Sequence, residues 1–243
     1  MGTTVTVAVE GAGLEGLSAL RFDNSAITAE KKAASQQFQV TIPPGTPPGL
    51  YDARAIGTYG GSAPRAFVVS RLTEQVEAEP NNAVDVAGQA VLNAAINGRI
   101  DKPGDIDCFQ FAARAGQHIV LECWAERIDS PLRAVLELYD AAGRRMAVNR
   151  GYAGLDPRVE FQAPADGAYV VKIFELTFAG GGTHFYRLDI DAGPRADFAF
   201  PPVVQRGKTV GMAECDVVDG DDRLIAKATS TCLALRGEAA EGR

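Results

Sequence analysis

The chain has 243 residues, which suits one large domain or two small ones, and its hydrophobic content of 46% is enough to form a sizeable core. Its net charge of −7, with no dense run of Lys or Arg, argues against nucleic acid as a partner, because such binding depends on neutralising phosphates. No apolar run approaches the roughly 18 residues that a membrane-spanning helix needs, so no membrane span is expected.

The residues after Met1 lack the basic and apolar regions of a signal peptide, and they already have the alternation of a strand. If the protein is exported, we expect this chain to be a fragment of a larger polypeptide that carries the leader.

The first 70 residues are predicted to form short strands. Val5, Val7 and Val9 alternate with small or polar residues, which is typical of a half-buried strand. Four prolines between Ile42 and Asp52 exclude a helix there. The other expected strands are Leu17–Phe22, Phe38–Ile42, Leu50–Ile56 and Arg65–Val69. Short strands at this spacing favour a β-sandwich.

The stretches VEGAGLEGLSALRF, IPPGTPPGLYDAR and PRAFVV resemble immunoglobulin-like modules that precede pre-peptidase domains in some secreted bacterial proteins.

Oxygen-bearing side chains gather at both ends of the segment from Val76 to Phe111. Glu77, Glu79 and Asn81 alternate at its start, and Asp105 and Asp107 lie in a Gly-Asp-x-Asp turn that leads into a strand. Ca²⁺ takes six to eight oxygen ligands in a flexible shell, so the five residues together predict a calcium site. For any single carboxylate, a solvated loop is the simpler interpretation.

Seven further strands are expected from the end of this segment onward: near Asp107–Phe111, His118–Trp124, Ala134–Tyr139, Met146–Val148, Val159–Gln162, Tyr169–Glu175 and Phe185–Ile190. The only helical hint, Ala83–Asn93, is interrupted by Gly88 and predicts one turn at most.

Six stretches of this region carry a family resemblance: EAEPNN, ING, GDIDCFQF, ARAGQHIVLE, SPLRAVLELYDAAGRRMAVN and LDPRVEFQAPADGAYVVKI. Together they resemble the bacterial pre-peptidase C-terminal domain, a relative of the clostridial collagen-binding domains. This resemblance covers about Val76 to Ala192.

The resemblance implies a jelly-roll-like sandwich that is appended to secreted proteins, often peptidases, does no hydrolysis itself and in several cases binds calcium. Arg133 stands where many relatives carry Asp, and Asn149-Arg150 stands where others carry paired acids. A cation site at those positions is therefore not expected, while the set that begins at Glu77 is intact.

The sequence shows little sign of a catalytic site. His118 and His184 accompany no nucleophile elbow, and no HExxH motif occurs. Tyr152 and Phe178 lie in loop-like contexts and are candidates for a binding surface; core packing explains Trp124 and Tyr139 equally well.

The cysteine pattern matches no zinc motif. Cys108 and Cys123 flank an expected hairpin, which predicts neighbouring strands and makes a disulfide geometrically possible, but two buried free thiols are the favoured interpretation.

The last part of the chain changes character. Val203–Val218 and Arg223–Leu235 are two long alternating runs around an Asp-Gly-Asp-Asp turn, which predicts a long hairpin. Arg206–Leu235 resembles the final hairpin of a hotdog-fold acyl-CoA thioesterase. The remainder of that fold is absent, so no catalytic residue is expected here.

The sequence therefore predicts an all-β protein of two tandem sandwiches and a hairpin: an immunoglobulin-like domain at 1–70, a pre-peptidase C-terminal-like domain at 76–192 and a hairpin at 203–236. We expect a non-catalytic accessory module of a larger protein, located outside the cell or in the cell envelope. It is expected to bind one Ca²⁺, and its partner is expected to be a protein or a polymer of the cell surface or matrix. The alternatives are the auxiliary domain of a secreted peptidase and a fused fragment of a thioesterase.

Overall fold

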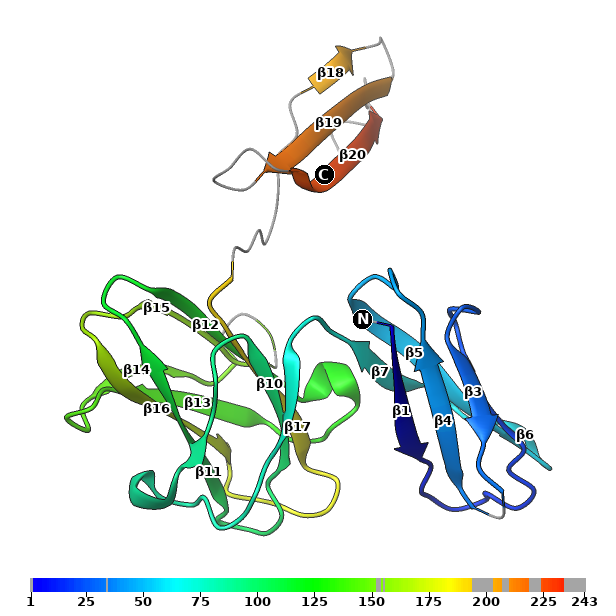
Figure 1. Cartoon of the computed structure of the whole chain (residues 1–243), viewed down its shortest axis with the longest axis horizontal. Coiled ribbons are helices and arrows are strands. Elements are labelled where there is room, and N and C mark those ends of the chain that lie inside the picture. Colours follow the sequence, from blue (N-terminus) through cyan, green and yellow to red (C-terminus); the bar gives the residue numbers. More distant parts are fainter. Residues whose placement is uncertain are drawn as a thin grey trace, which may run out of the picture. The chain divides into compact units, whose positions relative to one another are not determined.

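A computed structural model describes residues 2–33, 35–151, 154 and 156–193, and the backbone of three strands between residues 203 and 233 (Figure 1). Its described residues form β-strands and two single 3₁₀ turns, Val84–Val86 and Glu126–Ile128, with no α-helix. The predicted all-β class is confirmed. No helix among these residues is long and apolar enough to cross a membrane. The chain divides into two compact units, Met1–Ala192 and Gly193–Arg243, which are described separately below.

The first strands form two small sheets around one hydrophobic core. One sheet has the order β1-β4-β3, and the other has the order β2-β5-β6 with β7 paired to β5. The core of these strands is small and contains Leu17, Leu20, Ile27, Phe38, Val40, Ile42 and Val69. The bounds are β1 (Thr3–Ala8), β2 (Ala19–Phe22), β3 (Thr28–Lys31), β4 (Gln37–Ile42), β5 (Gly49–Gly57), β6 (Gly60–Gly61) and β7 (Arg65–Val69).

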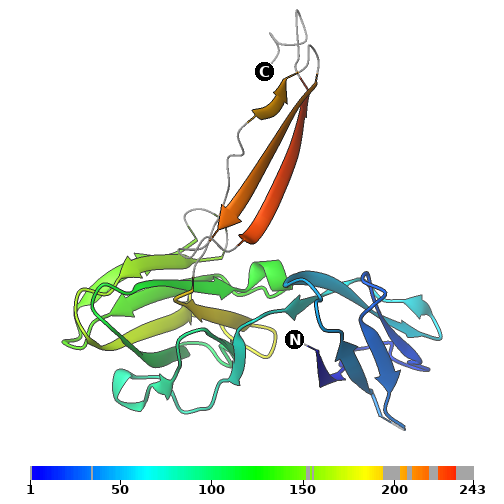
Figure 2. The same cartoon turned by 45° about the horizontal axis from the view of Figure 1, so that its top comes forward.

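The next ten strands build a pair of five-stranded sheets with the orders β15-β12-β17-β10-β8 and β14-β13-β16-β11-β9. The two sheets lie face to face as two layers (Figures 1 and 2). Alternate residues of each strand point into the space between the layers, as the two-residue period of a strand requires. The bounds are β8 (Thr73–Val76), β9 (Gly88–Gln89), β10 (Ala94–Arg99), β11 (Ile106–Ala113), β12 (His118–Trp124), β13 (Ala134–Tyr139), β14 (Arg145–Asn149), β15 (Arg158–Gln162), β16 (Gly167–Glu175) and β17 (Phe185–Asp191).

The large core between these layers is made by inward-facing side chains from both sheets. Leu121 and Ile119 of β12 and Leu188 of β17 meet Phe111 of β11 and Leu136 of β13, and all five are nearly or completely buried. At roughly 1.5–3 kcal/mol for each large apolar side chain, burial of this kind is the main stabilising term of the layer pair.

The expected strands of this region occur, and β12 and β13 have the predicted limits. In the first unit, the strands β3, β6, β8, β9 and β10 were not predicted. In β10 the sequence Asn97-Gly98 has the composition of a turn, but here it lies within a strand that pairs with β17 and β8. The expected single turn near Ala83 is present as Val84–Val86.

The two cysteines of this region are free and buried, as the favoured interpretation stated. The prediction that they lie on neighbouring strands is wrong. Cys108 is on β11, which pairs with β16 and β9, whereas Cys123 is on β12, which pairs with β15 and β17 in the other sheet. The connection from β11 to β12 crosses between the layers and is not a hairpin.

The second unit contains β18 (Val203–Arg206), β19 (Val210–Val218) and β20 (Leu224–Leu233), which form one antiparallel sheet in that order. The pairing of β19 with β20 agrees with the predicted hairpin. The predicted single strand Val203–Val218 is wrong, because β18 turns back and pairs with β19. The resemblance to a hotdog hairpin concerns side chains outside the described residues, and it stays a prediction, as do the domain limits at residues 70, 76, 192 and 203.

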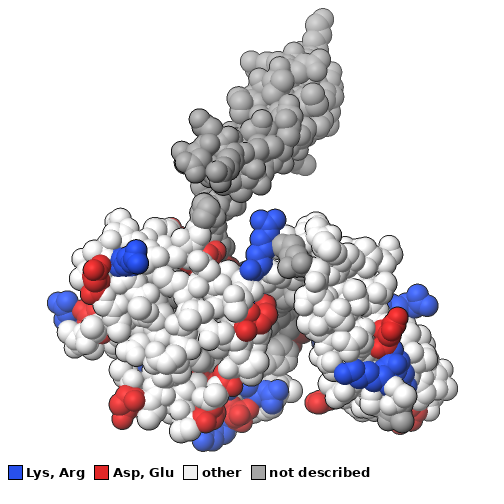
Figure 3. Space-filling view, viewed as in Figure 1, with Lys and Arg blue, Asp and Glu red and all other residues white. Residues whose placement is uncertain are grey.

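Charges of both signs are interspersed on the face of the molecule that Figure 3 shows. Among the described residues on this face, red acidic and blue basic side chains lie close to one another rather than in separate patches. Ion pairs among the described residues include Arg127 with Glu122 at 2.8 Å and Arg158 with Glu160 at 2.9 Å. On this face, the described residues form no basic stripe.

Candidate metal site

The candidate site lies at one end of the large core, between the two layers. Asp107 follows the same inward alternation on β11 as Phe109 and Phe111, so its carboxylate points between the sheets. On the opposite sheet, Tyr186 of β17 faces inward like Leu188. The Tyr186 hydroxyl donates a hydrogen bond of 2.6 Å to Asp107 Oδ2, which joins the two layers.

The segment after β8 covers this end of the core. Glu77 N donates to Asn97 O at 3.0 Å and so extends the pairing of β8 with β10 by one residue. Asn81 N then donates to Glu79 Oε2 at 2.9 Å, and the Glu79-Pro80 peptide bond is cis. Asn81 O accepts from Cys108 N at 2.9 Å, so the segment is attached to β11 beside Asp107.

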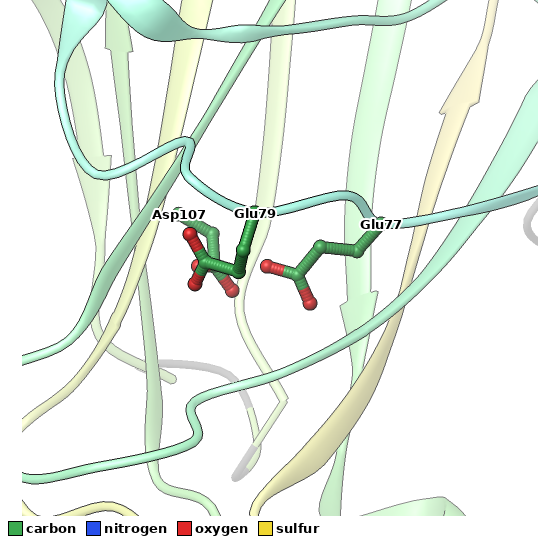
Figure 4. A group of neighbouring side chains, drawn as sticks. All are labelled: Glu77, Glu79 and Asp107. Carbon is green, nitrogen blue, oxygen red and sulfur yellow. The ribbon is translucent and has the colours of Figure 1, made fainter.

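Three of the five predicted ligands come together here. Carboxylate oxygens of Glu77, Glu79 and Asp107 all lie within 4.8 Å of one another. Figure 4 shows Glu77 and Glu79 reaching from the covering segment toward the same region as Asp107. Glu79 is exposed, Glu77 is half-buried and Asp107 is buried, so the group extends from the surface into the core.

Asn81 adjoins this group. Its side-chain Nδ2 donates to Glu77 Oε1 at 2.9 Å, while its buried Oδ1 has no hydrogen-bond partner. Asp107 Oδ1 is buried and without a partner too. An unpartnered buried oxygen is costly, because the group has lost its water without replacement. Two such acceptor atoms beside clustered carboxylates are the arrangement that a hard cation would satisfy.

Asp105 is not a member of the three-carboxylate group. Its Oδ1 accepts from Asn82 Nδ2 at 2.6 Å and its Oδ2 accepts from Asp101 N at 2.8 Å. Both oxygens therefore hold the turn before β11 and the segment after Asn81 in place. Sequence reasoning placed Asp105 with the ligands because a carboxylate before a strand has the same appearance in either role.

Burial dominates the electrostatics of the group. Burial first, and then the interaction with Glu77, raise the pKa of Asp107 from 3.8 to about 9, while the Tyr186 hydroxyl opposes the rise. Burial and the neighbouring Asp107 raise the pKa of Tyr186 as well. A carboxyl with so high a pKa holds a proton at neutral pH unless a cation replaces that proton.

Two residues of the site, Gly98 and Tyr186, were not predicted from the sequence. Gly98 is the cross-strand neighbour of Tyr186, and a Cβ at Gly98 would lie 2.4 Å from the Tyr186 hydroxyl and 2.6 Å from Glu77 Oε2. The glycine thus makes room for both groups. Tyr186 does have a sequence signal, because a hydroxyl at a core-facing position of an alternating strand requires a buried partner.

The predicted binding surface is only partly described. Tyr152 lies outside the described residues. Phe178 is 53% exposed, has a φ of 58° and stacks on Phe174 with 5.6 Å between ring centroids. The Glu175 carboxylate accepts hydrogen bonds from Thr177 N and Ala179 N at 2.5 and 3.0 Å, which fixes the loop that presents this ring.

Comparisons with known proteins find a relative that matches part of the chain. No protein-family model matches it. Over 73 residues, 30% of its length, the chain is 37% identical to a probable subtilase-type serine protease of Deinococcus radiodurans. The match covers 10% of that protease, so the chain spans a small part of the length of this curated relative.

Several solved structures are distant neighbours, among them the following two. The pre-peptidase C-terminal domain of a collagenase from Bacillus anthracis has 17% identity and a TM-score of 0.37, covering 47% of this chain and 99% of that domain. PliG of Aeromonas hydrophila, a periplasmic inhibitor of g-type lysozyme, has 13% identity and a TM-score of 0.31, covering 49% of this chain and 99% of that one.

Proposed function

We propose that this chain is a non-catalytic accessory and binding module of a larger secreted bacterial protein, and that one Ca²⁺ stabilises its five-stranded layer pair. Ca²⁺ would be held by Glu77, Glu79, Asn81 and Asp107. The observation that carries this proposal is the convergence of three carboxylates on a buried place that also contains unpartnered oxygens of Asn81 and Asp107.

The donor set fits a hard cation. All four residues offer oxygen atoms, and neither His nor Cys belongs to the group, as suits Ca²⁺ rather than zinc. A divalent cation would neutralise the mutual repulsion of the carboxylates. Because Glu77 directly follows β8 and Asp107 is the second residue of β11, the ion would link β8 to a strand of the opposite sheet.

Isothermal titration of the calcium-stripped chain with CaCl₂, together with its melting temperature, tests the metal. We expect saturable heat and a higher melting temperature, since an ion that binds only the folded state stabilises it. Glu79→Gln, which changes an exposed side chain, should weaken both effects. Asp101→Asn is the matched control, since Asp101 lies on a neighbouring loop and its side chain pairs with Arg99 at 3.9 Å, outside the group. No heat and no rise in melting temperature would remove the metal from the proposal.

The accessory role is supported by the partial match to a much longer protease, and we propose that the parent polypeptide is a secreted peptidase. An antibody against this chain should detect, in the culture supernatant, a polypeptide much longer than 243 residues. The purified chain should not cleave casein. A band of only this length inside cells would contradict the proposal.

A further inference from the structure

The edge strand β1 differs from the other edge of its own sheet. Edges are usually protected from pairing by charges, prolines or bulges. The opposite edge, β3, has the sequence TAEK and carries Glu30 and Lys31. β1 has the sequence TTVTVA, with no charge, no proline and no irregularity in its pairing with β4. An alternating strand of this composition is suited to pair with a further strand.

The hydrogen-bonding groups on the open side of β1 can be assigned from its register. Val9 N donates to Gln36 O, and the pairing continues with Val7 opposite Phe38 and Val5 opposite Val40. In an antiparallel pair, every second residue exchanges both hydrogen bonds with its partner and the residues between point their backbone groups away. The N–H and C=O groups of Thr4, Thr6 and Ala8 therefore face away from β4. Among the described strands, none pairs with that side.

An apolar groove lies next to this open side. It has a volume of about 460 Å³ and separates β1 from β5 and β7 of the other sheet; its walls include Val7, Val9, Leu20, Ala53, Ala55 and Phe67. Most of these side chains are only partly buried, although they point toward the core. On the far side of the groove, the N–H of Ala66 in β7 already donates to Asp129 Oδ2 at 2.9 Å. The side at β1 is the one that offers free backbone groups.

We propose that β1 is a docking site for an extended peptide strand supplied by another polypeptide, which would add to the sheet at β1. Its main chain would bond to Thr4, Thr6 and Ala8, and its alternate aliphatic side chains would fill the groove beside Val7 and Phe67. The two observations specify this occupant together: the unpaired edge requires an extended backbone, and the groove requires apolar side chains at every second position.

The proposal can be tested on the full chain with a labelled peptide of alternating valine and threonine flanked by lysines, measured by fluorescence anisotropy. Thr6→Pro removes one outward N–H, while a proline on the solvent side of an edge strand leaves the pairing with β4 possible. Thr6→Val is the matched control, because it keeps that N–H. We expect Thr6→Pro to weaken binding by about two- to tenfold, the factor that one net hydrogen bond represents, and Thr6→Val to bind as the wild type does.

A second variant covers the case in which Thr6→Pro disturbs folding. Ala55→Leu places a larger side chain in the groove without touching β1, and it should weaken peptide binding while the melting temperature does not fall. A peptide of the same sequence with methylated backbone nitrogens should not bind. Three results would overturn the proposal: no saturable binding to the wild type, equal binding to a well-folded Thr6→Pro and Ala55→Leu, or self-association of the chain that Thr6→Pro abolishes, which would make a second copy the occupant.

Discussion

The two β-layered regions of the first unit differ in how completely they close. Among the described residues, the core of the five-stranded layers contains 22 buried hydrophobic residues, and the core of the first strands contains seven. The larger core is closed at one end by polar groups that would be costly without a partner, Asp107 and Asn81. The smaller core is left open along β1. The region with more buried apolar surface gains more stabilisation, which can offset the cost of burying a carboxylate. The region with the smaller core leaves apolar side chains partly exposed beside β1, where they can contact a partner.

The largest effect is expected from truncating a side chain in the larger core. Leu121 is completely buried, so Leu121→Ala should lower the free energy of unfolding by about 2–5 kcal/mol. Val7 of β1 is only partly buried, and Val7→Ala should cost about 1 kcal/mol or less. Urea denaturation of both variants measures the difference. Equal losses would contradict the contrast between the two cores.

Asp107→Asn tests how much the buried carboxylate at the closed end of the core lowers the free energy of unfolding. Because the pKa of Asp107 is raised to about 9 in the folded state, the metal-free protein should be most stable below pH 4 with respect to this group and should lose that stability as the pH rises toward 9. Asp107→Asn should remove this loss and reduce calcium affinity by at least about tenfold. Calcium binding to the wild type should strengthen with pH over the same range. Melting temperatures from pH 5 to 9, with and without Ca²⁺, provide the measurement.

Gly98→Ala tests the space beside Tyr186 and Glu77. The added methyl group would lie within 2.6 Å of both side chains, so we expect a loss of about 1–3 kcal/mol and weaker calcium binding. Gly167→Ala on β16 is the control, because nothing lies within 4 Å of its Cβ position and the change should be nearly neutral. A calorimetric titration with Ca²⁺ and a melting curve for each variant measure the two effects. Unchanged calcium binding in Gly98→Ala would show that the space at this glycine is not needed for the metal site.

The smallest effects should have opposite signs in the two regions. Ala55→Leu fills part of the groove and should raise the free energy of unfolding by about 0.5–2 kcal/mol. The same substitution at Ala134, which is 2% exposed in the larger core, should lower it by about 1–3 kcal/mol through overpacking. Thermal unfolding of both variants compares them directly. Stabilisation at both positions would mean that the larger core is loosely packed as well.

Much of the strand pattern could be predicted because alternation is a local property of the sequence. β12 and β13 show it clearly, and their limits were predicted correctly. β10 was missed because Gly98 is unfavourable in a strand, and the reason for this glycine is a tyrosine that is remote in sequence. The group of Glu77, Glu79 and Asp107 was foreseen from the spacing of acidic residues. That Asp105 holds a turn, and that Tyr186 reaches Asp107, depends on which strands face each other across the layers, which alternation does not reveal.

The free thiols have a practical consequence. Cys108 and Cys123 are fully buried, and burial raises the pKa of Cys108 to about 11 and that of Cys123 well above its ordinary value. Thiol alkylation requires the exposed thiolate, so each residue should be modified only when the structure around it opens. With Cys215 and Cys232 replaced by serine, pulsed alkylation followed by mass spectrometry would time the opening of each sheet, since the two sulfur atoms lie on different ones. The two native thiols thus report the unfolding of each sheet separately, without any attached label.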